Sequence, residues 1–199
     1  MMFNHINLKN PGITTGVLPR NIFDGLMSEI KEVEQSDAGY LKMNNFLAGQ
    51  ITREYQLGRS REFMDPFLEE MARQYGKHFD YYPEHDFKVD SLWVNFQSKT
   101  EYNPIHNHDG MLSFVIWMQI PYNIEDEYQV THSQNSSLKA ASTFQFVYSS
   151  ILGNIINEKL EVTNGWEGRI VMFPSKLLHT VYPFFTSDNY RISVAGNIS

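Results

Sequence analysis

The chain has 199 residues, of which 42% are hydrophobic and 14% aromatic, and this is enough for one sizeable core. Its net charge is −7 and its Lys and Arg residues are scattered, which argues against a nucleic-acid groove built on phosphate neutralisation. Cysteine is absent, so disulfides and thiolate metal sites are excluded, and any metal must be held by His, Asp or Glu.

Helices are predicted in the N-terminal part of the chain. Residues 20–34 place Ile22, Leu26 and Ile30 on one apolar stripe with charged residues opposite. Residues 60–79 repeat this spacing, and Asp65-Pro66 marks either an early kink or the true start of that helix. Between them, Arg53–Tyr55 predicts an early strand that is either an exposed edge or a wall of a pocket.

From residue 89 the hydrophobic period changes to two, which predicts strands to the end of the chain. We expect them at residues 89–97, 111–120, 143–149, 155–163, 169–173, 179–183 and 190–198. Short strands after two helices favour a mainly β fold with a jelly-roll (double-stranded β-helix) core buttressed by two or more helices. We expect one domain over residues 1–199, in which 1–84 support a core formed by 85–199. The polar segment 123–141 interrupts the strands and is expected to be an insertion or a lid over the barrel mouth.

The sequence also bears on location. Residues 1–7 show no basic segment followed by an apolar run, so no signal peptide is predicted. The longest apolar stretch, around Phe114–Trp117, is far too short to span a bilayer. We therefore expect a cytoplasmic protein with no membrane partner.

The segment Asn103–Gly110 reads NPIHNHDG and carries two histidines two residues apart. Side chains at i and i+2 of an extended segment point the same way, and the Asn-Pro pair favours an extended entry to it. His179, at the start of a later predicted strand, can add a third imidazole to His106 and His108. Three imidazoles can close part of the coordination sphere of a metal ion and leave other positions open for a ligand.

Arg191 and Ser193 share one face of the last predicted strand. An inward arginine needs an anionic partner, because an unpaired buried guanidinium is costly. A carboxylate held in two places by Arg191, with a hydroxyl from Ser193, satisfies this need. Asn95 lies on one face of another strand and is expected either to form cross-strand hydrogen bonds or to contact a ligand.

The ordered set HxH, then Gly168-x5-Pro174 with His179 five residues beyond, then Arg191-x-Ser193, resembles the Fe(II)- and 2-oxoglutarate-dependent oxygenases. It is most similar to the branch common in marine bacteriophage and bacterial genomes, whose motif resembles N-P-x-H-x-H-x-G. The resemblance covers roughly residues 85–199. It implies that His106 and His179 are iron ligands and that Arg191, assisted by Ser193, binds the far carboxylate of 2-oxoglutarate; Asn95 is a further candidate contact.

The chain departs from the family at the middle ligand, where most members have H-x-D/E. His108 occupies that place, and we expect it to be the third ligand; Asp109 is the alternative if a bulge rotates the chain. Three neutral imidazoles leave Fe(II) its full charge, which a dianionic co-substrate can balance.

The resemblance further implies Fe(II) as cofactor, 2-oxoglutarate and O2 as co-substrates, and hydroxylation of a small molecule or protein with release of succinate and CO2. If a phage encodes the chain, it would act in the host cytoplasm. Oligomeric state is open, with a homodimer as one option.

Two alternatives compete with this interpretation. A cupin-like three-histidine metal dioxygenase would have Glu after three or four intervening residues beyond the HxH pair, where this chain has Leu112 and Ser113. A non-catalytic jelly-roll binding or structural phage protein would carry the histidines incidentally or around a structural metal.

Overall fold

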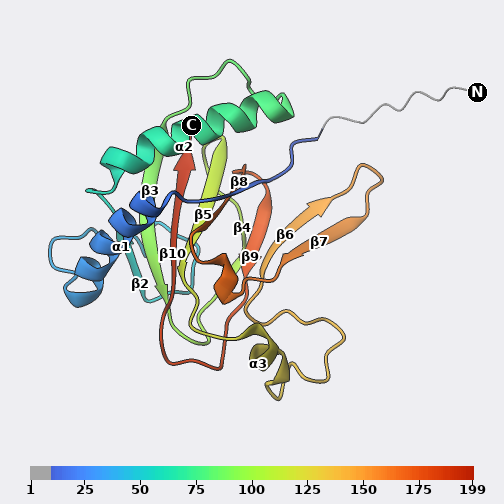
Figure 1. The fold of residues 1–199 in the computed structure, drawn as a ribbon. Coiled ribbons are helices and arrows are strands. Elements are labelled where there is room, and N and C mark those ends of the chain that lie inside the picture. The colour runs from blue at the N-terminus through green and yellow to red at the C-terminus, as the bar shows by residue number, and fades with distance from the viewer. Residues whose placement is uncertain (1–9) are drawn as a thin grey trace, which may run out of the picture.

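The computed structural model describes residues 10–199, which form two antiparallel sheets, three α-helices and one short 3₁₀ helix (Figure 1). Residues 1–9, part of the supporting region predicted over 1–84, lie outside the described residues. Within residues 10–199, none of the helices has the length and apolar character needed to cross a membrane.

The larger sheet has six strands and the smaller has four. In spatial order the larger contains β1 (Thr14–Val17), β8 (Arg169–Pro174), β5 (Leu112–Gln119), β10 (Arg191–Ile198), β3 (Val89–Gln97) and β2 (Arg53–Gln56). The smaller contains β4 (Asn103–His106), β9 (Leu178–Val181), β6 (Phe144–Ser149) and β7 (Ile155–Leu160). Apart from the β6–β7 hairpin, successive strands from β3 to β10 alternate between the two sheets. This is the double-stranded β-helix predicted from the sequence.

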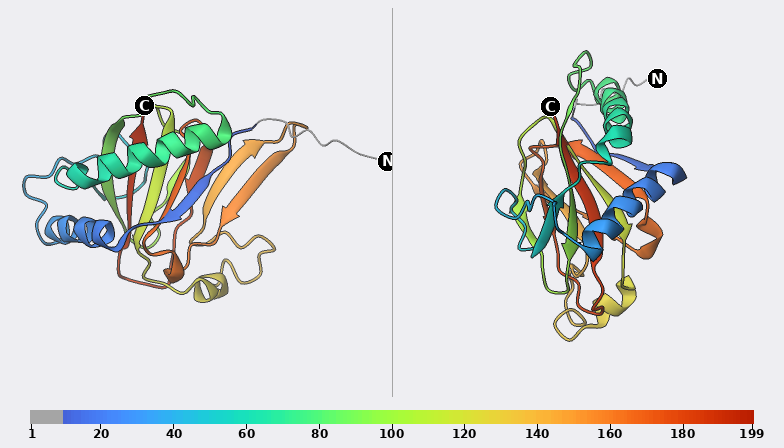
Figure 2. Two further views of the ribbon diagram at one scale, coloured as in Figure 1. Left: turned by 45° about the horizontal axis from the view of Figure 1, so that its top comes forward. Right: turned by 90° about the vertical axis from the view of Figure 1, so that its left-hand side faces the viewer.

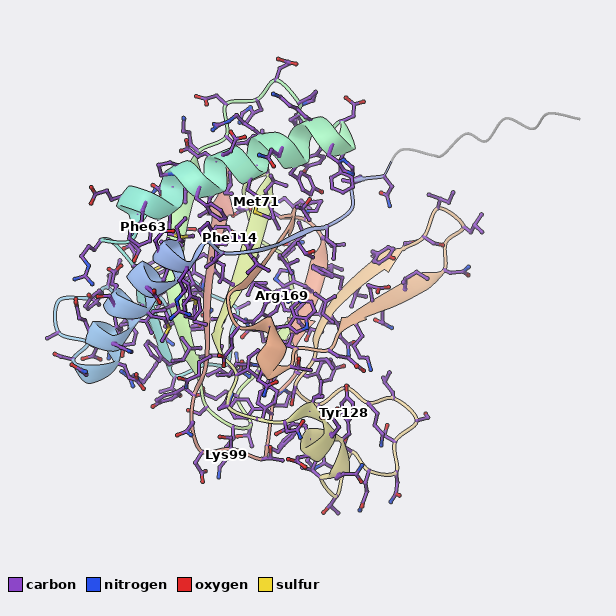
Figure 3. All side chains as sticks on the ribbon, in the orientation of Figure 1. Phe63, Met71, Lys99, Phe114, Tyr128 and Arg169 are labelled. Carbon is purple, nitrogen blue, oxygen red and sulfur yellow. The ribbon has the colours of Figure 1, made fainter. Side chains whose placement is uncertain are left out.

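Helices α1 (Arg20–Gln35) and α2 (Arg61–Phe79) cover the face of the larger sheet that is turned away from the smaller one (Figures 1 and 2). Phe63 and Met71 on α2 pack in the same layer as Phe114 on β5 (Figure 3). The helix α2 begins at Arg61, so the prediction that Asp65-Pro66 marks its start is wrong. A proline this near the N-terminus of a helix removes only one early hydrogen bond.

A second apolar layer fills the space between the two sheets. Strand β5 serves both layers, because Phe114 and Ile116 face the helices whereas Val115 and Trp117 face the smaller sheet. This double burial explains why β5 reads as a continuous apolar run. The inner layer is rich in aromatic rings and adjoins the histidines described below; its members include Phe144, Phe146, Phe173 and Phe184.

The predicted strands are confirmed to within a few residues, with two shorter than expected. β9 ends at Val181 rather than at residue 183, since Pro183 has no N–H to extend the ladder. β7 ends at Leu160 instead of residue 163. The early strand at Arg53–Tyr55 is present as β2, and β1 was not predicted.

The segment 123–141 contains a short helix, α3 (Ile124–Gln129), which the sequence analysis did not anticipate. Glu127 on this helix is fully buried and accepts hydrogen bonds from the backbone N–H groups of Phe185 and Thr186, both at 2.8 Å. These bonds fix the segment to the loop between β9 and β10.

Candidate metal centre and its pocket

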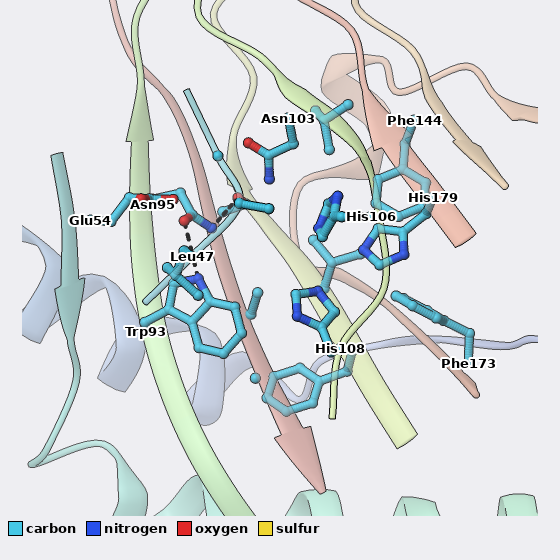
Figure 4. Close-up of a pocket in the computed structure, with 18 residues that line it drawn as sticks. Leu47, Glu54, Trp93, Asn95, Asn103, His106, His108, Phe144, Phe173 and His179 are labelled. Carbon is cyan, nitrogen blue, oxygen red and sulfur yellow. Dashed lines mark hydrogen bonds between the residues drawn. The ribbon is translucent and has the colours of Figure 1, made fainter. Parts of the chain in front are cut away.

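Three histidines from two separated parts of the chain meet between the sheets. His106, the last residue of β4, lies opposite His179 on β9, and their ring centroids are 4.2 Å apart. The ring of His108 lies 4.9 Å from that of His106 and 5.1 Å from that of His179. Each ring offers one nitrogen, and these nitrogens all lie within 4.8 Å of one another, so a single ion can reach all three (Figure 4).

His108 lies beyond the end of β4, and backbone hydrogen bonds hold it there. Its N–H donates to the carbonyl of Ser175 at 2.9 Å, and the N–H of Ser175 donates to the carbonyl of Met111, also at 2.9 Å. Gly110, between His108 and Met111, has a φ of +85°, a conformation that favours glycine. The turn therefore aims His108 back at the two strand histidines.

Two of the imidazoles have their ring orientation fixed by backbone carbonyls. Nδ1 of His106 lies 2.7 Å from the oxygen of Pro104, and Nδ1 of His179 lies 3.0 Å from the oxygen of Leu177. A carbonyl can only accept, so each Nδ1 carries the proton and each Nε2 keeps its lone pair for a ligand.

Burial keeps all three imidazoles neutral near pH 7. It lowers the pKa of His106 below its usual value. Burial, reinforced by repulsion from the His106 ring, lowers the pKa of His108 to about 4, and the same two causes lower the pKa of His179 to about 3. Neutral imidazole is the form that coordinates metals.

Asp109, the alternative middle ligand, does not join this group. Its side chain is fully exposed and pairs with the Nζ of Lys176 at 3.1 Å. Among residues 10–199, His106, His108 and His179 form the cluster of metal-ligating side chains that the geometry brings together.

The cluster lines a pocket of about 500 Å³, its open mouth included. The larger sheet, which includes Phe173, supplies one wall and the smaller sheet, with Phe144, another, while Leu47–Gly49 of the loop before β2 lie at the edge of the pocket. None of the pocket-lining residues comes from segment 123–141, so its expected position as a lid over this pocket finds no support in the lining.

A polar line crosses the wall formed by the larger sheet. The indole N–H of Trp93 donates to Asn95 Oδ1 at 3.1 Å, and Asn95 Nδ2 donates to the hydroxyl of Ser193 at 3.2 Å. The cross-strand hydrogen bonding expected for Asn95 is therefore confirmed. Both Asn95 and Ser193 line the pocket.

Arg191 lies two residues before Ser193, on the same face of β10. It does not itself line the pocket. It is 3% exposed, and its guanidinium donates to the side chains of Gln97 and Tyr122. The remaining bonds go to the backbone carbonyls of Ser142 and Tyr182, at 3.0 and 2.9 Å. These acceptors are all neutral, and no carboxylate in the described part of the chain lies within ion-pair distance, so the buried charge is not compensated.

Glu54 on β2 is a pocket residue that the sequence analysis did not single out, although it allowed that its strand formed a pocket wall. Its side chain is 1% exposed and lines the same pocket as the histidines. Burial, and secondarily the nearby charge of Glu101, raise the pKa of Glu54 to about 7. Its inward direction follows from pairing with Asn95, because directly opposed residues of neighbouring strands face the same side.

A family model described as a 2OG-Fe(II) oxygenase matches residues 91–197. No curated protein sequence matches the chain. Similar solved structures include a Pseudomonas putida prolyl-4-hydroxylase, with 12% identity, 93% of this chain and 90% of that chain covered, and a TM-score of 0.57. A Trichoplax adhaerens prolyl hydroxylase in complex with a hypoxia inducible factor oxygen degradation domain peptide has 10% identity, coverages of 94% and 82%, and a TM-score of 0.56.

A third similar structure is a viral collagen prolyl hydroxylase from Paramecium bursaria Chlorella virus-1 in complex with 2OG. It has 12% identity to this chain, coverages of 94% and 94%, and a TM-score of 0.52. At these identities the three structures establish the shared fold, and the family model carries the family assignment.

Proposed function

We propose, since the matched region makes up more than half of the chain and the protein therefore belongs to the 2OG-Fe(II) oxygenase family, that His106, His108 and His179 hold its Fe(II). The protein is an oxygenase that uses Fe(II), 2-oxoglutarate and O2. This membership decides against the non-catalytic jelly roll and the cupin-like enzyme. The assignment to the branch of marine phage and bacterial genomes stays a prediction.

The observation that carries the ligand assignment is the convergence of three neutral imidazoles within 4.8 Å at the pocket wall. Imidazole nitrogen is a ligand that suits iron, and the rings of His106 and His179 already present an unprotonated Nε2 for coordination. Fe(II) bound there would supply the redox centre for oxidative decarboxylation of 2-oxoglutarate to succinate and CO2 with hydroxylation of the substrate. The exposed ion pair of Asp109 with Lys176 supports His108 as the third ligand.

We further propose that Arg191 binds the far carboxylate of 2-oxoglutarate. Its uncompensated buried charge supports this role, because a carboxylate would neutralise a guanidinium that now has only neutral acceptors. Two of those acceptors, Gln97 Oε1 and the Tyr122 hydroxyl, belong to side chains, so a carboxylate would replace side-chain acceptors and leave the bonds to the two backbone carbonyls in place. Ser193 and Asn95 would then contact the body of the diacid along the polar line between Arg191 and the histidines.

The chain's own tasks in the reaction are to orient two ligands and to exclude water. The rings of Phe144 and Phe173 flank His179, with centroids 5.5 and 4.9 Å from its own, so the metal side of the pocket is apolar. We propose that residues 1–199 act as one domain, which is supported by the pairing of β1 with β8 and of β2 with β3. The substrate, whether small molecule or protein, the cytoplasmic location and the oligomeric state stay predictions.

Release of succinate tests the ligand assignment. The purified chain with Fe(II), 2-oxoglutarate and air should form succinate, and omission of either Fe(II) or 2-oxoglutarate should stop it. The variant His106→Ala should lose at least about 100-fold of this turnover, because one of three metal ligands is gone. His78→Ala removes an exposed histidine on α2 and is the matched control, expected to keep the wild-type rate. Succinate release by His106→Ala at the wild-type rate would overturn the assignment.

A further inference from the structure

Building on the proposed function, we propose that the pocket contains a second recognition site, the acceptor subsite, formed by Glu54, Asn103 and the space beside Gly49. It binds a cationic nitrogen group of the substrate, either an ammonium or a guanidinium. A substrate held there by its nitrogen group would lie in the same pocket as the three histidines.

The acceptor subsite joins the edges of the two sheets. Glu54 lies on β2, an edge strand of the larger sheet, and Asn103 is the first residue of β4, an edge strand of the smaller one. Gly49 lies in the loop that precedes β2. All three residues line the pocket, and Figure 4 shows Glu54 and Asn103 on the side of the pocket away from Phe173.

Two oxygens of this subsite lack donors. Asn103 Oδ1 is buried and accepts no hydrogen bond from the described part of the chain. Of the Glu54 carboxylate, Oε2 accepts one long bond, from Asn44 Nδ2 at 3.3 Å, and Oε1 accepts none from residues 10–199. Buried acceptors without donors are costly, and a ligand that donates hydrogen bonds removes the cost.

The two oxygens lie close to each other, against the backbone of Gly49. A Cβ placed on Gly49 would lie 2.7 Å from Asn103 Oδ1 and 2.9 Å from Glu54 Oε1. Both oxygens are therefore near enough for a single N–H-bearing group on the pocket side to meet them. Glycine at position 49 places no side chain against either oxygen.

Charge selects a cation for this place. A carboxylate ligand would be repelled by Glu54 and is better placed toward Arg191, beyond the polar line of Asn95 and Ser193. A neutral donor would satisfy Asn103 but leave the carboxylate of Glu54 uncompensated. An ammonium has three donors and a guanidinium five, and both carry the charge that Glu54 lacks as a partner. The raised pKa of Glu54 agrees with this, since its first cause is burial, which disfavours the charged carboxylate.

Binding of simple probes to the full chain, with Zn(II) in place of Fe(II) and with 2-oxoglutarate present, tests the proposal. The probes are n-butylammonium, n-butanol and pentanoate, which differ in the head group and can be compared by calorimetry. The dissociation constant of n-butylammonium should be at least about ten-fold lower than those of the other two. Equal affinity for n-butylammonium and n-butanol would overturn the proposal.

The isosteric variant Glu54→Gln should weaken n-butylammonium binding about ten-fold or more and leave n-butanol unaffected. Glu158→Gln makes the same change on the exposed strand β7 and is the matched control, expected to bind as the wild type does. An affinity of Glu54→Gln for n-butylammonium within about two-fold of the wild type would contradict a role for the carboxylate.

Two variants test the subsite without removing Glu54. Gly49→Ala should press a methyl group against Asn103 Oδ1 and Glu54 Oε1, displace these oxygens and weaken n-butylammonium binding. Asn103→Asp should add a negative charge and tighten n-butylammonium binding. Should Glu54→Gln fail to fold, an unchanged affinity of Gly49→Ala would by itself overturn the proposal.

These measurements separate the subsite from the reaction. Succinate release without Glu54-dependent binding of n-butylammonium would overturn the acceptor subsite and leave the proposed function standing. Glu54-dependent binding without succinate release would support the subsite and contradict the proposed function.

Discussion

Arg191 and Glu54 are buried side chains of opposite charge that project from the same face of the larger sheet, yet they are satisfied to very different degrees. Arg191 donates five hydrogen bonds to four neutral groups of the protein. Glu54 accepts a single bond, at 3.3 Å. One end of the site is therefore already assembled, whereas the other has acceptors that no donor of residues 10–199 fully satisfies.

The difference matches the two ligands that such an enzyme must bind. 2-Oxoglutarate is the same in every turnover, and its far carboxylate would exchange with side-chain acceptors that already hold the guanidinium of Arg191 in place. The substrate side carries a carboxylate and a free amide oxygen, and discriminates by leaving them unpaired when the wrong group enters. Four tests follow, ordered by the size of the expected effect.

Replacement of Arg191, at the assembled end, should have the largest effect on ligand affinity. Arg191→Met removes the guanidinium, and the dissociation constant of 2-oxoglutarate should rise about 100- to 1,000-fold, because a buried, hydrogen-bonded charge partner is lost. Equilibrium titration of 2-oxoglutarate into the metal-loaded protein measures this. Unchanged Co(II) affinity of the same variant would show that the histidine cluster is intact, and unchanged 2-oxoglutarate affinity would contradict the assignment of Arg191.

At the unpaired end, Glu54 should make the free energy of unfolding depend on pH. Glu54 has a pKa of about 7 in the folded chain against an ordinary value of 4.5, so its stabilising contribution is complete below pH 4.5 and is lost as the pH rises through 7. Between pH 4 and pH 8 the metal-free wild type should lose about 3 kcal/mol of unfolding free energy relative to Glu54→Gln. Urea unfolding at both pH values measures the difference, and parallel profiles for the two proteins would contradict the raised pKa.

A smaller effect is expected along the polar line that joins the two ends. Ser193→Ala removes a hydroxyl that accepts from Asn95, and 2-oxoglutarate affinity should fall about five- to ten-fold, the value of one hydrogen bond. The same variant should bind n-butylammonium as the wild type does. If it instead weakened n-butylammonium and spared 2-oxoglutarate, the two ends would have to be reassigned.

The smallest effect is expected at Asp109, outside both ends. Asp109→Asn breaks an exposed ion pair with Lys176, so the affinity for Co(II) should change less than about two-fold. A loss of metal affinity as large as that of His108→Ala would instead identify Asp109 as a ligand.

Much of this arrangement was predictable because it depends on short-range patterns. The period-two run from residue 89 predicted the strands. The HxH spacing predicted that His106 and His108 point toward one ion, and their nitrogens do converge, although the turn after β4 rather than strand alternation aims His108. Alternation also predicted that Arg191 and Ser193 share one face of the last strand, as they do.

The features that the sequence did not predict depend on contacts between distant segments. The acceptors around Arg191 come from Gln97, Tyr122, Ser142 and Tyr182, which only the folded sheets bring together. Glu54 enters the pocket because β2 pairs with β3 in one register, and a one-residue shift would point it outward. The position of segment 123–141 depends on the bonds of Glu127 to the loop between β9 and β10, which no local pattern reveals.

The most direct test of the central claim, that three imidazoles from β4, the following turn and β9 hold one iron beside a diacid, is an anaerobic titration with Fe(II) and 2-oxoglutarate. The weak visible charge-transfer absorption of an iron–2-oxoglutarate chelate should appear in the wild type. It should be lost in His179→Ala, and in Arg191→Met it should need far more 2-oxoglutarate to form. An absorption of unchanged strength in His179→Ala, or none in the wild type, would contradict the account.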